Sequence, residues 1–230
     1  MTFAKEFEAM PRVWGVGRVM VGDPSGATRG RVVPWEMSAA DIEDETEIAA
    51  DHYRALGLGD GDLVLVVALL SQAIHAVPLE QGAGRVGALY SSADATRFDA
   101  FRTASLIRQL HAKVVIGVDA EITTGLDDLD RDLADVFGPV SAVVTADQEA
   151  HARLVAAGLR PGRYLRLGPT SAVAPPGTDA LVYDTERWQV DEDAGELLLT
   201  NLADRLMPCD RFRTGIRGTV PEPGRILLTP

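Results

Sequence analysis

The stretch Gly59-Asp-Gly-Asp-Leu-Val-Leu-Val-Val67 decides which fold class the chain can adopt. Its first four residues favour a turn, and the five that follow are apolar without alternation. An unbroken apolar run of this length is typical of a strand that is covered on both faces, as in a parallel sheet. The stretch therefore predicts a buried parallel strand over 63–67.

The sequence on both sides of this strand predicts helices and further strands in alternation. Before it, Ser38-Ala-Ala-Asp41 has the form of a capping box, and a helix is expected from there to the glycine stop at Gly57. After it, the pattern predicts helices over 71–86, 96–110, 126–137 and 147–157 and strands over 88–90, 113–118, 142–145 and 164–167. Alternation of this kind predicts an α/β domain over 1–168, a mostly parallel sheet flanked by helices.

The rhythm breaks at Gly168-Pro-Thr-Ser-Ala-Val-Ala-Pro-Pro-Gly177, which is rich in proline and glycine. We expect a linker over 169–178. Beyond it only short strand-like segments follow, over 180–183, 188–190, 196–200 and 226–228. A small β-rich portion is therefore expected over 179–230.

Composition limits the partners and the environment of the protein. The formal net charge of −12 over 230 residues opposes binding to nucleic acid or to anionic lipid. The single cysteine, Cys209, excludes an intramolecular disulfide, and no cluster of cysteine and histidine has the spacing of a zinc site. No apolar run approaches the roughly 20 residues that span a bilayer. We expect a cytoplasmic protein with no metal.

Two glycine-containing segments resemble phosphate-binding motifs to different degrees. Gly82-Ala-Gly-Arg-Val-Gly87 has the spacing of a dinucleotide-binding turn, but the residues before it look helical, so the end of a closely packed helix is the better interpretation. In Asp23-Pro-Ser-Gly-Ala-Thr-Arg-Gly-Arg31, small and hydroxyl residues could turn backbone N–H groups toward an anion, and Arg31 adds a positive charge. An ordinary turn is the alternative for this segment.

The other reactive residue types give weaker signals. Arg211 and Arg213 would point the same way from an extended chain and could hold a carboxylate or phosphate, although pairing with acidic neighbours is the default. The histidines lie on expected helices without a partner at catalytic spacing, and Cys209 lacks a base. The aspartates over 127–135 lack calcium-loop spacing and predict a solvated acidic helix face.

Four segments together resemble the adenylate-forming carboxylate–CoA ligases, and specifically the phenylacetate–CoA ligase branch. They are Ser25-Gly-Ala-Thr-Arg-Gly-Arg31, Leu56-Gly-Leu-Gly-Asp-Gly-Asp62, Gly195-Glu-Leu-Leu-Leu-Thr200 and Met207-Pro-Cys-Asp-Arg-Phe-Arg-Thr-Gly-Ile216. The family forms are a Ser-Ser-Gly-Thr-Thr-Gly-Lys-Pro loop, LGL-x-x-GD-x-V, GELVLT and MP-x-x-RYRTGD. The resemblance implies a truncated version of the family's N-terminal domain. It also implies a degenerate phosphate loop at Ser25, Gly26, Thr28, Gly30 and Arg31, with Arg211 and Arg213 nearby.

The departures from the family pattern point to lost ATP contacts. Ile216 stands where the family has the aspartate that holds the ribose hydroxyls, and isoleucine accepts no hydrogen bond. No clear match exists for the family's YG-x-[ST]-E segment, since Tyr183-Asp-Thr-Glu186 lies too close to Gly195. No lysine follows Lys113, so we expect no C-terminal lid domain with its catalytic lysine.

The resemblance and its departures leave two function classes open. The first is a degenerate ligase-like protein that no longer adenylates, needs no cofactor and acts as an aryl or acyl binding or accessory protein. The second is an enzyme: a carboxylate–CoA ligase using ATP, magnesium and CoA, completed by a partner chain, or a repurposed acyl-transfer enzyme. Family members are commonly dimers, so a homodimer or a complex with a partner enzyme is expected.

Overall fold

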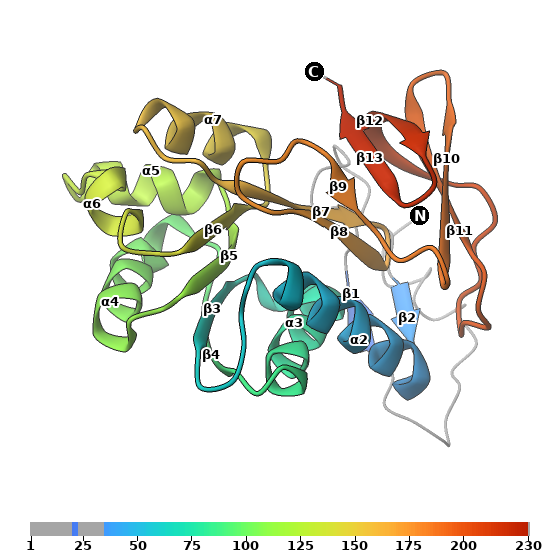
Figure 1. The fold of residues 1–230 in the computed structure, drawn as a ribbon, viewed down its shortest axis with the longest axis horizontal. Helices are drawn as coiled ribbons and strands as arrows, with labels where there is room; N and C mark the ends of the chain where they lie inside the picture. The colour runs from blue at the N-terminus through green and yellow to red at the C-terminus, as the bar shows by residue number, and fades with distance from the viewer. Residues whose placement is uncertain (1–19, 23–34, 230) are drawn as a thin grey trace, which may run out of the picture.

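The computed structural model describes residues 20–22 and 35–229 as an α/β fold built on one large sheet (Figure 1). The helices are α2 (Ala39–Ala55), η1 (Leu70–Gln72), α3 (Ala73–Arg85), η2 (Arg97–Asp99), α4 (Ala100–Leu110), α5 (Ala120–Asp128), α6 (Leu133–Phe137) and α7 (Gln148–Ala156). The strands are β1 (Met20–Gly22), β2 (Trp35–Met37), β3 (Leu63–Val67), β4 (Leu89–Ala93), β5 (Val114–Val118), β6 (Ala142–Thr145), β7 (Gly162–Leu167), β8 (Thr170–Ala174), β9 (Leu181–Val182), β10 (Trp188–Asp193), β11 (Glu196–Asn201), β12 (Phe212–Glu222) and β13 (Arg225–Leu228).

The strand order shows a parallel half that continues into an antiparallel half. Eleven strands are hydrogen-bonded in the order β10-β11-β12-β13-β9-β8-β7-β6-β5-β3-β4, and β1 pairs separately with β2. Pairing is parallel from β4 through β3, β5 and β6 to β7, and antiparallel from β7 onward. The expected parallel sheet flanked by helices is confirmed, and so is its β-rich continuation.

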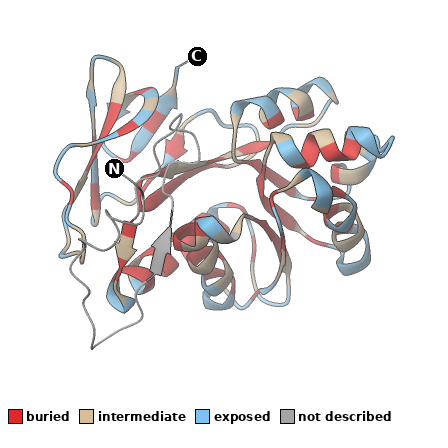
Figure 2. Cartoon of the chain, turned by 180° about the vertical axis from the view of Figure 1, so that it is seen from behind, coloured by how far each residue is buried: buried red, intermediate tan, exposed pale blue. Residues whose placement is uncertain are grey.

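Helices cover both faces of the parallel half, as the apolar run of β3 predicts. Leu65 and Val67 pack with residues of α4, α5, α6 and α7, whereas Val64 and Val66 pack with residues of α2 and α3. Figure 2 shows the buried residues along the central strands and on the inner faces of the helices. Because successive side chains of a strand point to opposite faces, an unbroken apolar run fills two cores at once.

The local signals around α2 and α3 are also confirmed. Ser38 caps α2 through its hydroxyl and Asp41 completes the capping box. Gly82 lies in α3, and a Cβ at this position would come within 2.8 Å of the Cβ of Ala49 in α2. The glycines of 82–87 therefore serve close helix packing and the end of a helix, because α3 ends at Arg85.

Three segments differ from the sequence expectation. Residues 126–137 form two helices, because Asp119 caps α5 and Asp132 caps α6, with Asp130 at a positive φ of 51° between them. Within 169–178, expected as a linker, Thr170–Ala174 forms strand β8, which pairs with β7 along its whole length. Proline and glycine flank that strand without interrupting it, and the β-rich end is consequently part of the same sheet.

Within the described parts of the chain, no helix has both the length and the apolar character needed to cross a lipid bilayer.

Candidate functional site

The first candidate site residues lie at the start of β12. Arg213 donates to Glu196 at 2.5 Å and to Asp193 at 2.8 Å, and the Arg211 guanidinium lies 3.8 Å from Asp191. The carboxylates belong to β10 and β11, so the ion pairs run across three neighbouring strands. We call these five residues the arginine row. The structure brings both predicted arginines together, and both are paired with acidic neighbours.

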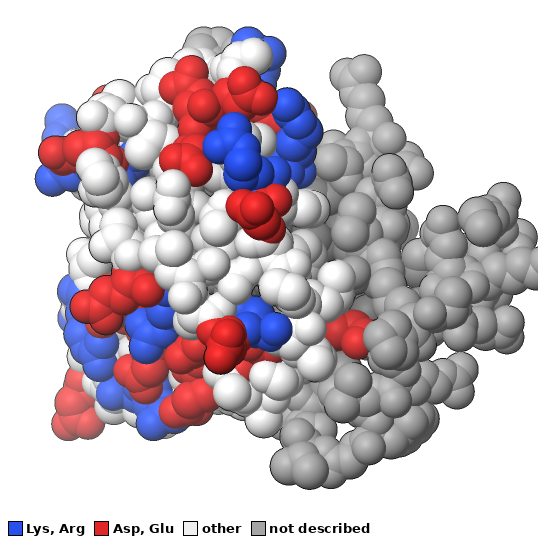
Figure 3. Space-filling view, turned by 90° about the vertical axis from the view of Figure 1, so that its right-hand side faces the viewer, with Lys and Arg blue, Asp and Glu red and all other residues white. Residues whose placement is uncertain are grey.

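The arginine row lies in solvent. The side chains of Arg211 and Arg213 are 56% and 60% exposed. Figure 3 shows the face around the β-rich end, where positive and negative side chains lie beside one another instead of forming separate patches. Hydrogen bonding to Glu196 raises the pKa of Arg213 further, so its guanidinium stays charged. Ion pairs with this exposure contribute little to stability, because water screens the charges.

The residues after the arginine row turn inward. The Thr214 hydroxyl is buried and donates to the Leu197 carbonyl oxygen at 2.8 Å. Gly215 has a φ of 74°, which a glycine tolerates, and its N–H donates to Glu196 at 3.1 Å. Ile216 is half-buried and packs against the core of the β-rich end. An apolar side chain thus fills the position that follows the glycine.

The turn between β7 and β8 faces this segment. Gly168 has a φ of 58°, and a Cβ there would lie 3.3 Å from the Phe212 ring and 3.4 Å from Leu199. Phe212 in turn makes an edge contact with Trp35, with ring centroids 5.3 Å apart. The side chains of β11 and β12 therefore lie against the turn, and Trp35 of β2 packs on Phe212.

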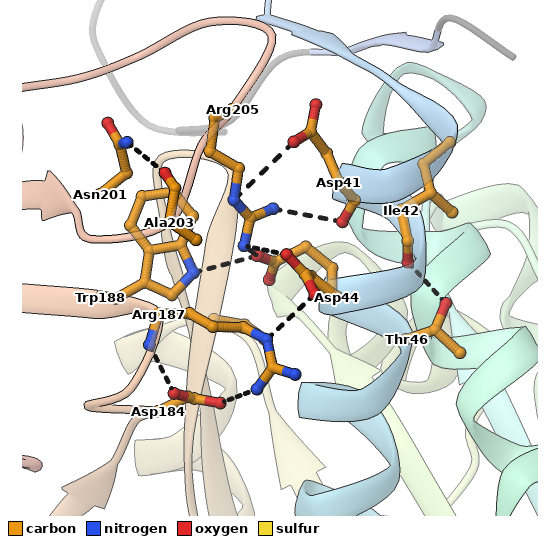
Figure 4. A network of polar contacts seen from close by, with 12 residues as sticks. Asp41, Ile42, Asp44, Thr46, Asp184, Arg187, Trp188, Asn201, Ala203 and Arg205 are labelled. Carbon is orange, nitrogen blue, oxygen red and sulfur yellow. Dashed lines mark hydrogen bonds and ion pairs between the residues drawn. The ribbon is translucent and has the colours of Figure 1, made fainter. Parts of the chain in front are cut away.

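A buried charge cluster joins α2 to the loop between β11 and β12 (Figure 4). Arg205 comes from that loop, its side chain is only 3% exposed, and its guanidinium lies 3.0 Å from Glu45, 3.6 Å from Asp44 and 3.8 Å from Asp41. It also lies 4.7 Å from the centre of the Trp188 ring, whose Nε1–H donates to Glu45 at 3.0 Å. We call these five residues the Arg205 cluster.

Electrostatics within the Arg205 cluster are set mainly by burial. Burial raises the pKa of the Glu45 carboxyl to about 7, although the nearby Arg205 favours the charged form. The cluster holds one cation, Arg205, among three carboxylates. Within the described residues, no group of histidine, cysteine and carboxylate side chains has the geometry to hold one.

The remaining candidates have structural roles. His52 is buried with its Nε2 3.1 Å from the Ser171 hydroxyl, and burial lowers its pKa to about 4. Burial raises the pKa of the Cys209 thiol to about 11, so the thiolate is disfavoured. Asp127 and Asp128 are exposed and pair with Arg153 and Arg97, as a solvated acidic face requires.

The predicted phosphate loop, with Ser25, Gly26, Thr28, Gly30 and Arg31, lies outside the described residues. Its role stays a prediction. Sequence reasoning did not find the Arg205 cluster, and no local pattern could have revealed it, because Arg205 meets partners on α2 that are distant in sequence.

The fold is that of adenylate-forming ligases. The chain matches an open conformation of 2-hydroxyisobutyryl-CoA ligase in complex with 2-HIB-AMP and CoA, at 15% identity, a TM-score of 0.69 and coverage of 91% of this chain and 55% of that one. It matches the Klebsiella oxytoca NpsA N-terminal subdomain in complex with 3-hydroxyanthranilyl-AMSN at 14% identity, a TM-score of 0.62 and coverage of 92% and 61%. It matches ATP-bound MatB from Rhodopseudomonas palustris at 15% identity, a TM-score of 0.60 and coverage of 91% of this chain and 47% of that one.

The chain spans about half the length of the solved ligases it matches. No family model and no curated protein matches its sequence. The likeness in fold confirms the architecture expected from the resemblance.

Proposed function

We propose that this chain is a degenerate phenylacetate–CoA ligase-like protein that no longer adenylates and that binds an aryl or acyl carboxylate, either by itself or as an accessory to a partner enzyme. In this proposal it acts in the cytoplasm, as a homodimer or in complex with that enzyme, and needs no ATP, magnesium or CoA. Two observations support the proposal: the fold, and the changed contacts of the residues that would hold a nucleotide.

The observation that carries the proposal is the position of Ile216. In the related ligases an aspartate at the end of the Arg-Thr-Gly segment holds the ribose hydroxyls, whereas Ile216 packs against the apolar core here. A buried charge-assisted hydrogen bond contributes about 1.5–3 kcal/mol. Replacing that hydrogen bond by an apolar contact weakens nucleotide binding. The Ile216 side chain contributes to core packing instead.

The turn between β7 and β8 supports the same conclusion. The turn contains Leu167-Gly-Pro-Thr-Ser171, which has neither the tyrosine nor the acid of the family segment YG-x-[ST]-E and is no clear match for it. The Ser171 hydroxyl lies 3.1 Å from His52 Nε2 in the interior. A serine so engaged does not replace a carboxylate near a magnesium ion, because it lacks the charge that the metal prefers.

The arginine row adds a third loss. Arg213 is already paired with Asp193 and Glu196, so a triphosphate would have to compete with two carboxylates for it. Adenylation requires positive charge placed around the reacting phosphate, and several simultaneous losses reduce the rate together.

A ligase completed by a partner chain is the second candidate. It is favoured by the match to the NpsA N-terminal subdomain, which was solved in complex with 3-hydroxyanthranilyl-AMSN and which this chain covers over 61% of its length. In this alternative the chain retains a nucleotide site, and another polypeptide supplies the missing groups.

One pair of measurements separates the two candidates. Isothermal titration calorimetry with ATP and magnesium, together with pyrophosphate exchange in the presence of benzoate, phenylacetate and hexanoate, tests for adenylation. We expect no ATP binding and no exchange, but a rise in melting temperature with at least one of the acids. Micromolar ATP binding or measurable exchange would overturn the proposal in favour of the ligase.

A further inference from the structure

A groove of about 750 Å³ lies between α4 and α6, at the end of the sheet opposite to the β-rich portion (Figure 1). Lys113 and Ser141, which precede β5 and β6, form part of its lining. The groove is therefore at the amino ends of the parallel strands. Arg211, Arg213 and Ile216 belong to the β-rich end and do not line the groove, so the groove is a separate place on the molecule.

The groove has the size and the mixed character of a small-molecule site. Phe101, Ala104 and Ile107 of α4 form one apolar wall, and Val136 and Pro139 form the other. Sites for organic ligands typically have volumes of about 300–1,000 Å³ and a mostly apolar lining with a few polar groups. The apolar walls suit an aromatic ring or a short acyl chain.

Two arginines in the lining have no ion-pair partner among the described residues. Arg108 and Arg131 both line the groove, and neither makes an ion pair or side-chain hydrogen bond with any residue that the structure describes. Most other described arginines are paired, as expected in a chain with a net charge of −12. Two free guanidiniums beside an apolar wall favour a ligand that carries an anionic group.

The acidic residues of the lining limit the charge of that ligand. The Asp132 carboxylate accepts from the Ala134 N–H at 2.7 Å, and Lys113 is already paired with Asp62 at 2.7 Å. Asp130 and Asp135 have no such partners among the described residues. A polyphosphate would be repelled by these two carboxylates, whereas a single carboxylate can lie against the arginines.

From this arrangement we infer that the groove between α4 and α6 binds an apolar monocarboxylate, with its carboxylate on Arg108 and Arg131 and its apolar body between Phe101 and Val136. The inference rests on the proposed function, because it assigns a place to the aryl or acyl ligand. It places that ligand away from Ile216 and the arginine row.

Binding of phenylacetate and hexanoate, measured by calorimetry on the full chain, tests this assignment. We expect Arg108→Gln and Arg131→Gln each to weaken binding by about tenfold, which is a modest loss for a charge-assisted contact at a partly open site. Both side chains are exposed, so the variants should keep the melting temperature of the parent. Arg160→Gln is the matched control, since Arg160 is also exposed and unpaired within the described residues but lies outside the groove.

A second variant tests the apolar part. Ala104→Trp would fill the groove from α4 and should abolish binding of both acids. Equal affinity of the parent and all these variants for phenylacetate would overturn the groove assignment while leaving the proposed function intact. Failure of every acid to bind the parent at millimolar concentration would overturn both. Tight binding of ATP or CoA that Arg108→Gln weakens would contradict the monocarboxylate assignment.

Discussion

The Arg205 cluster and the arginine row are built from the same residue types but differ in burial. Arg205 is 3% exposed among three carboxylates, whereas Arg213 is 60% exposed between two. In the interior the loss of one partner leaves charges without compensation, while at the surface water replaces it. Ion pairs of the same residue types therefore have different roles. The Arg205 cluster joins two parts of the fold, whereas the arginine row lies on its surface.

Arg205→Ala would test the buried side of this comparison most severely. The change leaves Asp41 and Glu45 without their cation, while Asp44 keeps its contact with Arg187 at 3.2 Å, so we expect the free energy of unfolding to fall by about 3–5 kcal/mol. Urea denaturation followed by circular dichroism measures it. A loss below about 1 kcal/mol would show that the cluster is no more important than a surface pair.

The pH dependence of stability should reveal the protonation of Glu45. Its pKa is about 7 in the fold and has an ordinary value of 4.5, so between these values the folded state binds more protons than the unfolded state. Stability from this group is present at low pH and is lost as the pH rises toward 7. Relative to Glu45→Gln, the parent should lose on the order of 3 kcal/mol between about pH 4.5 and 8.

The comparison with Glu45→Gln also removes other titrating groups from the measurement. His52 has a pKa lowered to about 4 by burial, so its own contribution runs in the opposite direction and is lost as the pH falls. Both proteins carry His52, and its effect cancels in the difference. A difference that stays constant across the range would contradict the protonation of Glu45.

Trp188→Phe sharpens the comparison by removing one hydrogen bond from the Arg205 cluster while keeping an aromatic ring. The Glu45 carboxylate loses its 3.0 Å indole donor but keeps Arg205, and a hydrogen bond to a charged group contributes about 1.5–3 kcal/mol. Trp35→Phe is the control, because Trp35 is also buried and packs by its ring against Phe212. Equal losses in thermal denaturation for the two variants would assign the effect to ring size alone.

Arg213→Gln gives the smallest expected effect. The exposed pairs with Asp193 and Glu196 contribute less than about 1 kcal/mol, and added salt should reduce the difference from the parent further. Urea denaturation at low and high salt measures both. A loss as large as that of Arg205→Ala would remove the distinction between the two regions.

Local patterns predict the parallel half of the fold well. The run Leu63–Val67 forms a strand buried on both faces, Ser38 caps α2, and Gly82 allows α3 to pack closely on α2. Each of these signals depends on residues close together in the sequence. Local patterns of this kind can therefore be recognised without knowledge of the fold.

Features that depend on distant partners were not predictable from the sequence. Strand β8 lies between turn-forming residues and is stabilised as a strand by β7 and β9 on its two sides. The same holds for the candidate site. Arg211 and Arg213 were identified because they lie two residues apart in a recognisable sequence motif. Arg205 gains its role only by pairing with carboxylates of α2.

The position of β8 has a consequence for how this architecture can be divided. Because β8 and β9 hydrogen-bond the parallel half to β13, and β13 to β12, the backbone network is unbroken from one edge to the other. A gene split near residue 175 would give two polypeptides, each with an unpaired edge strand that is prone to aggregation. The two fragments would fold only when expressed together, so the whole sheet is the smallest unit that recombination can transfer intact.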